Sequence, residues 1–156
     1  MSRPRALRAV EALPAGSLDQ HPVAGMRTPK ELVVHLFTMV REFPTAVREG
    51  AVRDFDEAKI AAGIADKAAL ISYCRAAWHE GDAAVATLTD GQIGAMVKTP
   101  WGDHHGFVML QILNDELWHH RGQLYVFLRA LGVEPAMLYD YEHNDPEFRS
   151  KEQATA

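Results

Sequence analysis

The sequence predicts an all-α protein, a four-helix bundle formed by a single domain over residues 1–156. Two observations carry this prediction. Four stretches of the chain repeat apolar side chains at helical spacing, and most of them are bounded by capping residues, glycine or proline. With 156 residues, of which 47% are hydrophobic, the chain can bury one core and is short for two domains. Helices that each carry one apolar stripe bury it against one another, which favours a bundle.

The composition excludes several classes of protein and partner. Charged residues make up 24% of the chain, so disorder is not expected. A formal charge of −5 at pH 7 argues against a nucleic-acid-binding surface, which needs clustered positive charge. No apolar run reaches the roughly 20 residues of a membrane span, and no apolar leader follows the charged start. The one cysteine, Cys74, cannot form an internal disulfide. We therefore expect a reduced, cytoplasmic protein with neither nucleic-acid nor membrane partners.

The first helix is predicted over residues 2–13. It ends at Pro14 and Gly16, residue types that interrupt helices. Residues 14–27 hold two prolines and two glycines, so we expect a connecting loop there.

The second helix has a well-marked start at Thr28. Proline follows at the first helical position, and Glu31 lies three residues after Thr28, which is the pattern of a capping box. Apolar residues then recur at helical spacing as far as Gly50. Within this stretch Pro44 predicts a kink or an early break, because proline lacks the backbone N–H that a helix needs. The recurring apolar residues are Leu32, Leu36, Met39, Phe43 and Val47.

The third helix is predicted from Asp66, a capping residue, to about Leu88. Gly81 lies inside it and weakens the local helical preference. The preceding residues 51–65 are ambiguous and are compatible with one or two helical turns.

The segment 89–106 carries four glycines and one proline. We expect a short hairpin or loop within it, at 92–104, with a first strand from Ile93 to Val97. The last long helix runs from about His105 to Leu131. It ends at Gly132, since glycine is favoured just beyond a helix. Residues 142–156 are charged, and we expect a frayed tail there.

Eight histidines are the one unusual feature of the composition, and their helical positions matter. On the last helix His120 falls inside the apolar sector that should face the core. Glu116, one turn earlier, lies at the edge of that sector, about 40° from His120. Side chains at i and i+4 are neighbours, so these two can bind one ion. His119 points away from the core centre. The apolar sector consists of Leu113, Leu117, Leu124, Phe127, Leu128 and Leu131.

The second helix repeats this arrangement. His35 lies at the edge of its apolar stripe, and Glu31 precedes it by one turn. If the two helices are neighbours, His35 can meet Glu116 and His120. Two histidines and one carboxylate form a three-ligand set with open positions, which is the kind of site that polarises water or a substrate.

Structural roles are open alternatives for these residues. A histidine on an apolar face is usually a satisfied core residue, and Glu116 can form an ordinary salt bridge with Arg121 or Arg129. His104 and His105 lie near a glycine-bounded loop, where they are either solvated or at the mouth of a pocket.

Other chemistry is poorly supported. Cys74 lies in an apolar, helical setting, whereas reactive thiols need an accessible, electropositive one. The chain has no G-x-S-x-G motif and no glycine-rich phosphate loop, so serine hydrolases and nucleotide binding of those types are not indicated.

The stretch from His119 to Gly132, HHRGQLYVFLRALG, with the Val-Glu-Pro that follows, resembles the DinB family, also called the YfiT-like metal-dependent hydrolases. The resemblance implies a four-helix bundle that holds a divalent ion, often nickel or zinc, through three histidines. His120 matches the family's histidine before Arg-Gly-Gln, and His35, within ELVVHL, matches the histidine of the earlier helix. At the third position, four residues before His120, this chain has Glu116.

The departure at Glu116 has two interpretations. A carboxylate still ligates zinc, nickel, manganese or iron, but it is harder than imidazole and adds a negative charge. Alternatively, Glu116 marks a site that has been lost. With the first interpretation, the expected metal ligands are His35, Glu116 and His120. The expected cofactor is one divalent transition metal, nickel or zinc first and manganese or iron as alternatives.

The resemblance further implies metal-dependent hydrolysis of a small-molecule substrate, or transfer of a low-molecular-weight thiol such as mycothiol, bacillithiol or glutathione. The sequence identifies no catalytic residue and does not choose between these reactions. The competing hypothesis is a non-catalytic stress-response bundle, or one that binds a small ligand. Apolar surface around Tyr139 and Tyr141 is compatible with a homodimer, which nothing in the sequence fixes.

Overall fold

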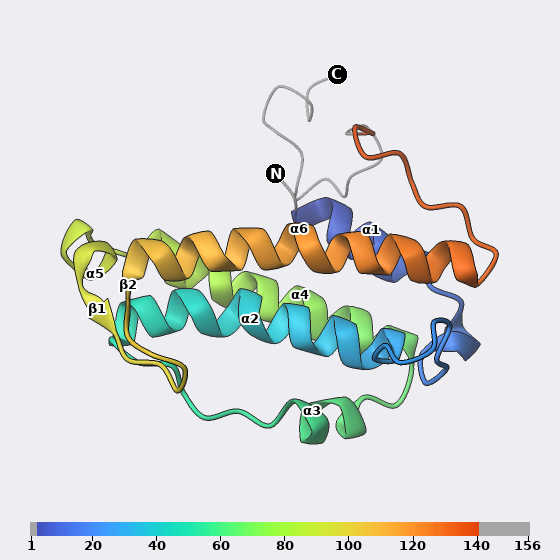
Figure 1. Cartoon of the computed structure of the whole chain (residues 1–156), viewed down its shortest axis with the longest axis horizontal. Helices are drawn as coiled ribbons and strands as arrows, with labels where there is room; N and C mark the ends of the chain where they lie inside the picture. Colours follow the sequence, from blue (N-terminus) through green and yellow to red (C-terminus); the bar gives the residue numbers. More distant parts are fainter. Residues whose placement is uncertain (1–2, 141–156) are drawn as a thin grey trace.

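A computed structural model describes residues 3–140, and within them the predicted four-helix bundle is confirmed. In Figure 1 the helices α2 and α6 lie side by side, with α4 and α1 behind them, and α3 (Glu57–Gly63) lies below α2. The bundle helices are α1 (Arg3–Ala12), α2 (Pro29–Glu49), α4 (Lys67–Ala86) and α6 (Gly106–Ala130). The short elements are a 3-10 turn (Ala15–Ser17), α3 (Glu57–Gly63), α5 (Asp90–Gly94), β1 (Met96–Val97) and β2 (His104–His105).

The predicted starts of α2 and α4 are confirmed in atomic detail. The backbone N–H of Thr28 donates to Oε2 of Glu31 at 2.8 Å, and the N–H of Glu31 donates to Oγ1 of Thr28 at 3.2 Å, which completes the capping box. At the start of α4, Asp66 accepts from the N–H of Ala69 at 2.8 Å. Gly50 ends α2 with φ 81°, a left-handed conformation that glycine adopts without strain. Local capping chemistry therefore determines where these helices begin and end.

Of the two outcomes expected at Pro44, a kink or an early break, the break does not occur, because α2 continues through Pro44 to Glu49. Proline has no N–H, so the carbonyl of Val40 lacks its usual helical donor. Gly81 of α4 lies against this carbonyl, and a Cβ built on Gly81 would be only 2.3 Å from the Val40 oxygen. The glycine that weakens α4 locally is thus what allows α4 to pack closely on α2.

The hairpin expected within 89–106 is confirmed, but its first strand begins later than predicted. A capping box between Thr89 and Gln92 starts α5, which takes up Ile93. The strand β1 then pairs antiparallel with β2, with Met96 opposite His105. The helical turn was missed because its capping signal is short and lies among glycines.

Each bundle helix contributes completely buried apolar residues to one core. Val10 of α1, Phe37 of α2, Leu70 of α4 and Phe127 of α6 are all 0% exposed. The core sector predicted for α6 is confirmed, with Leu131 at its end only partly buried.

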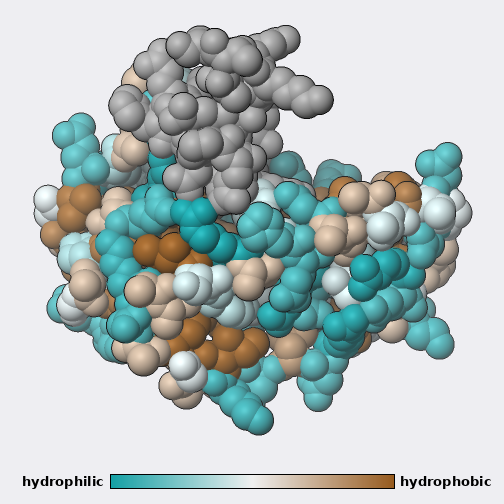
Figure 2. Space-filling view, turned by 180° about the vertical axis from the view of Figure 1, so that it is seen from behind, coloured by the Kyte–Doolittle hydropathy of each residue, from teal (hydrophilic) through white to brown (hydrophobic). Residues whose placement is uncertain are grey.

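Figure 2 shows a face on which hydrophilic side chains separate smaller hydrophobic patches. None of the helices in the described residues is long and apolar enough to cross a membrane. The expected tail, and Tyr141, lie outside the described residues.

Candidate metal centre

The three predicted ligands come together where α2 faces α6. His35, Glu116 and His120 each offer one ligand atom, and these atoms all lie within 4.8 Å of one another. The rings of the two histidines are nearly perpendicular, with centroids 4.9 Å apart. Residues that are 81 positions apart in the sequence therefore form one cluster because α2 packs on α6.

The most buried member of the cluster is His120, which is 5% exposed. Its Nε2 lies 2.9 Å from Oε2 of Glu116, yet this buried nitrogen has no hydrogen bond of acceptable geometry among the described residues. Buried polar atoms are nearly always satisfied, so an orphaned one needs an explanation. A cation held between the imidazole and the carboxylate would satisfy both atoms.

Both histidines have a hydrogen-bond acceptor beside Nδ1, and this contact orients the ring. Nδ1 of His120 lies 2.6 Å from Oε1 of Gln123. Nδ1 of His35 lies 2.8 Å from Oε1 of Glu57 and 3.0 Å from Oε2. An N–H on each Nδ1 donates to these oxygens, which leaves Nε2 unprotonated in the neutral ring. Metal-ligating histidines show this same pattern, so the donor set fits a divalent transition metal.

Burial also favours the neutral form of His120. Desolvation is the largest influence and lowers the pKa of His120 below the ordinary 6.5. The hydrogen bond to Gln123 raises the pKa, nearby His35 lowers it, and the Glu116 carboxylate raises it. The net lowering means that His120 is neutral at pH 7 and does not have to release a proton before it binds a metal.

Glu57 is a functional candidate that the sequence did not reveal. It lies in the first turn of α3, within the segment that the sequence left ambiguous. Asp56 caps this helix by accepting from the N–H of Lys59 at 2.9 Å. That local signal can indicate the helix, but no spacing rule relates Glu57 to a histidine 22 residues earlier. Only the fold of the loop back onto α2 brings them together.

Other polar candidates on α2 and the hairpin do not reach the cluster. Glu31 is engaged in the capping box with Thr28. His104 and His105 form β2 at the start of α6, and Nδ1 of His105 lies 2.7 Å from the carbonyl oxygen of Gly94. About ten helical residues, or roughly 15 Å, separate this hairpin from Glu116.

The salt-bridge alternatives for Glu116 are not realised among the described residues. The guanidinium of Arg121 lies over the ring of Trp118, 4.2 Å from its centroid. Arg129 donates to the backbone carbonyl of Tyr125. The one ion-pair partner of Glu116 in this part of the chain is His120.

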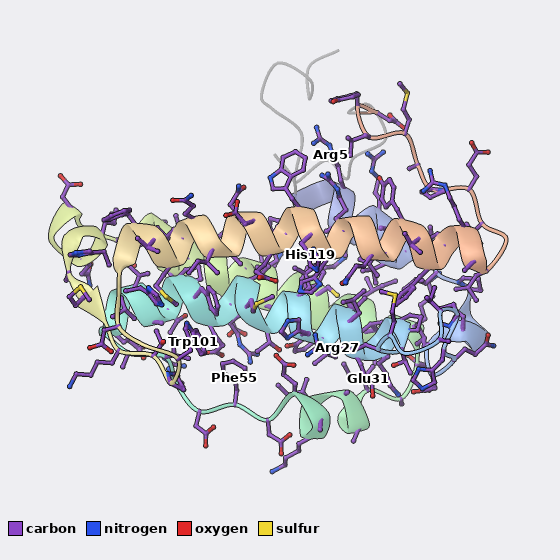
Figure 3. The ribbon with its side chains drawn as sticks, viewed as in Figure 1. Arg5, Arg27, Glu31, Phe55, Trp101 and His119 are labelled. Atoms are coloured by element: carbon purple, nitrogen blue, oxygen red, sulfur yellow. The ribbon has the colours of Figure 1, made fainter. Side chains whose placement is uncertain are left out.

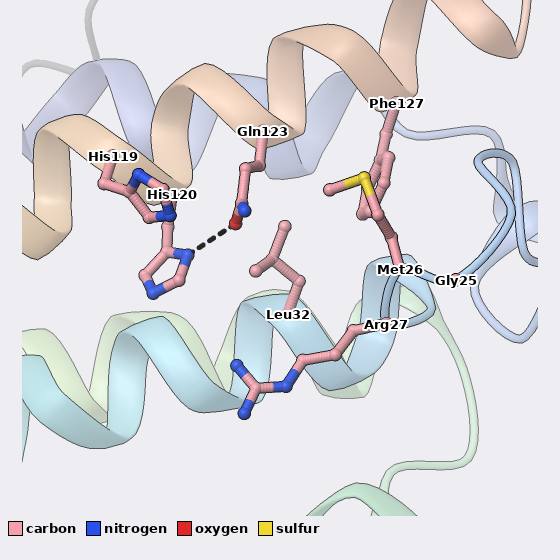
Figure 4. A pocket seen from close by; sticks show the side chains of 8 residues that line it. All are labelled: Gly25, Met26, Arg27, Leu32, His119, His120, Gln123 and Phe127. Carbon is pink, nitrogen blue, oxygen red and sulfur yellow. Dashed lines mark hydrogen bonds between the residues drawn. The ribbon is translucent and has the colours of Figure 1, made fainter.

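A pocket of about 350 Å³ lies beside His120, between α6 and the residues that lead into α2. Figure 3 shows His119 and Arg27 on facing elements in this region, and Figure 4 shows the pocket from close by. His119, predicted to point away from the core centre, is exposed, and its ring centroid is 4.9 Å from that of His120. The pocket is lined by Gly25, Met26, Arg27, Leu32, His119, His120, Gln123 and Phe127. A small molecule can therefore approach one of the candidate ligands directly.

Residues 1–124 match the family model of the DinB superfamily, so the chain belongs to that superfamily. No curated protein matches the sequence.

Two solved structures from Bacillus subtilis share the fold. The DinB-like protein YjoA has a TM-score of 0.71 and 19% sequence identity, covering 88% of this chain and 90% of YjoA. YfiT has a TM-score of 0.63 and 21% identity, covering 84% of this chain and 82% of YfiT. YfiT is described as a probable metal-dependent hydrolase with an unusual four-helix bundle topology. At these identities the likeness establishes the architecture of the bundle.

Proposed function

We propose that this protein binds one divalent transition metal through His35, Glu116 and His120 and uses it on a small-molecule substrate. One observation carries the proposal: two histidines and one carboxylate each place a ligand atom within 4.8 Å of the others, and the Nδ1 of each histidine faces a hydrogen-bond acceptor. Three protein ligands leave coordination positions for water or substrate, as in catalytic rather than structural sites. Nickel or zinc is our first expectation for the metal, and the carboxylate also suits manganese or iron.

The reaction we favour is metal-dependent hydrolysis, with transfer of a low-molecular-weight thiol as the alternative within the same site. A bound divalent ion would lower the pKa of a coordinated water or thiol, which both reactions need. The description of YfiT as a probable metal-dependent hydrolase supports the first reaction. In either reaction Glu116 and the two histidines bind the metal, and Gln123 and Glu57 orient the histidines. The pocket beside His120 admits the substrate. Cys74 takes no part, because it is completely buried.

Metal content tests the proposal first. We expect elemental mass spectrometry of untagged protein, purified without chelator, to give about one equivalent of a transition metal per chain. His35→Ala and His120→Ala should each lose it while the far-ultraviolet circular dichroism stays helical. His79→Ala is the matched control, because His79 is an exposed histidine on α4 outside the cluster, and it should keep the metal. Absence of metal after incubation with zinc, nickel and manganese would overturn the proposal.

Substitution of Glu116 tests its place in the ligand set. Glu116→His should give a site with three nitrogen donors and shift the preference toward nickel or zinc over manganese, since softer donors favour those ions. Competition between metals, measured on both proteins, checks this. An unchanged preference would show that Glu116 is not a ligand.

Thermal unfolding with and without EDTA separates a catalytic site from the non-catalytic bundle. A structural metal contributes its binding free energy to folding, so its removal lowers the melting temperature strongly. For the proposed open site we expect a folded, metal-free bundle that melts only slightly earlier, because none of the three proposed ligands belongs to the hydrophobic core. Collapse of the fold on chelation would favour the non-catalytic alternative.

A further inference from the structure

The pocket beside His120 has a basic end that the ligand set does not use. Arg27, in the loop before α2, contributes an exposed guanidinium to the lining, and it forms no ion pair or hydrogen bond with any described residue. None of the described residues that line the pocket is acidic. An arginine without a carboxylate partner at the wall of a pocket is a ready site for an anion, because its planar fork matches carboxylate and phosphate groups.

Two further polar groups add hydrogen-bond donors to the same pocket. Oε1 of Gln123 accepts from His120, which leaves the amide NH₂ of Gln123 free to donate. His119 is exposed and contributes a second ring beside that of His120. The polar lining is therefore richer in donors than in acceptors, which again selects an oxyanion.

The rest of the lining is apolar and lies on one side. In Figure 4 the guanidinium of Arg27 and the ring of His120 lie to the left of Leu32, whereas Met26 and Phe127 lie to its right. Leu32 and Phe127 are both buried members of the core, so this wall is fixed. A ligand that fits both parts has an anionic head near Arg27 and an apolar body against Leu32 and Phe127.

We propose that this pocket binds a small organic oxyanion, with its head on Arg27 and its apolar body against Leu32 and Phe127. This inference deepens the proposed function and rests on it, because the pocket is a substrate site only if His120 binds the proposed metal. The anionic head of the ligand would then lie on the side of His120. The pocket's volume of about 350 Å³ suits a molecule of this size, at the lower end of small-molecule sites. Arg27 is a specificity-determining residue in this proposal, and it selects substrates by charge.

A pair of ligands with the same shape and different charge tests the inference. We would titrate the full chain with hexanoate and with hexanamide and follow binding by NMR chemical shifts, both as purified and after EDTA treatment. The EDTA arm matters because a bound metal would also attract a carboxylate. In both arms hexanoate should bind at least about tenfold more tightly than hexanamide, the effect of one charge-assisted hydrogen-bonding pair. Hexyl phosphate, titrated alongside, shows which oxyanion the pocket prefers.

Variants assign the effect to Arg27. In EDTA-treated protein, Arg27→Met should remove the preference for hexanoate over hexanamide, and Arg27→Lys should keep part of it, because the charge remains and the planar guanidinium is lost. Arg48→Met is the matched control, since Arg48 is an exposed arginine at the other end of α2, and it should bind as the wild type does. In EDTA-treated protein, equal binding of hexanoate and hexanamide by the wild type, or wild-type affinity of Arg27→Met for hexanoate, would overturn the inference.

The two proposals fail separately. A chain that binds no metal but still prefers hexanoate in an Arg27-dependent way refutes the metal site and supports the pocket. A chain that binds metal but shows no charge preference after EDTA treatment refutes the pocket and leaves the metal site standing.

Discussion

Oε1 of Glu57 lies 2.8 Å from Nδ1 of His35, and this contact connects the short helix α3 to the candidate metal centre. Ala61 and Ile64, in and just after α3, are buried and hold this segment against the bundle. The orientation of one candidate ligand therefore depends on a segment outside the four bundle helices. Figure 1 shows α3 below α2, outside the four bundle helices.

Replacement of Glu57 should weaken metal binding without removing a ligand. We expect Glu57→Ala to lower the affinity for zinc by about 10–100-fold, the usual effect of losing an acceptor behind a ligating histidine. Glu57→Gln keeps an acceptor oxygen and should lose less. Competition with a chromophoric chelator measures both affinities. Asp54→Ala, an exposed carboxylate in the same segment, is the control, and equal affinities for all four proteins would contradict the assigned role.

The protonation of His120 should depend on burial and on Glu116. In EDTA-treated protein we expect its NMR titration midpoint below 6.5, because desolvation lowers the pKa of His120. Glu116→Gln should lower the midpoint further, since the carboxylate raises the pKa of His120. A midpoint at or above 6.5 in the wild type would contradict this description of the site.

The same pKa shift predicts how stability changes with pH. Because the folded-state pKa of His120 lies below the unfolded value, the unfolded chain binds more protons in the interval between them. This group's contribution is therefore complete above pH 6.5 and is lost as the pH falls from 6.5 toward the folded-state pKa. Urea unfolding of EDTA-treated wild type and His120→Gln, from neutral pH downwards, measures it. The two free energies of unfolding should converge at acidic pH, and a constant difference would contradict the prediction.

Gly81 should be intolerant of any side chain. A Cβ at this position would lie 2.3 Å from the Val40 carbonyl oxygen, which is backbone and cannot move independently of α2. We expect Gly81→Ala to lower the free energy of unfolding by about 1–3 kcal/mol, the usual cost of overpacking. Gly122→Ala is the control within α6, where a Cβ meets nothing within 4 Å. It should instead raise stability by about 1 kcal/mol, because alanine favours helix. Urea denaturation compares the two variants, and changes of the same sign would refute the close contact.

Cys74 should be inert in the native protein. It is 0% exposed, and burial raises the pKa of its thiol well above the ordinary value, so little thiolate forms. We expect no alkylation by iodoacetamide at mildly alkaline pH, and full alkylation in concentrated guanidinium chloride. Mass spectrometry follows the reaction. Rapid alkylation of Cys74 in the folded chain would contradict this prediction and make a catalytic role for the thiol a hypothesis to test.

Local signals were sufficient for most of the helices. The capping box at Thr28 and the cap at Asp66 use side chains within three residues of the groups they satisfy, so the sequence alone reveals them. The same holds for the pairing of Glu116 with His120, which follows from i and i+4 positions on one helix. Prediction was less successful at Pro44 and Gly81. There each residue's effect depends on the other helix, because Gly81 lies against the carbonyl that Pro44 leaves without a helical donor.

The sequence by itself determined the class of fold, the helix starts and the half of the candidate site that lies on α6, because these depend on interactions within a few residues. The prediction of His35 as the third ligand assumed that its helix is a neighbour of the helix with Glu116 and His120, which the sequence only suggests. The tertiary structure brings His35 to these two residues. The tertiary structure alone placed Glu57 behind His35 and Arg27 in the pocket wall beside His120. Both residues come from connecting segments, whose positions depend on how the chain folds back on the packed helices and leave no periodic pattern in the sequence.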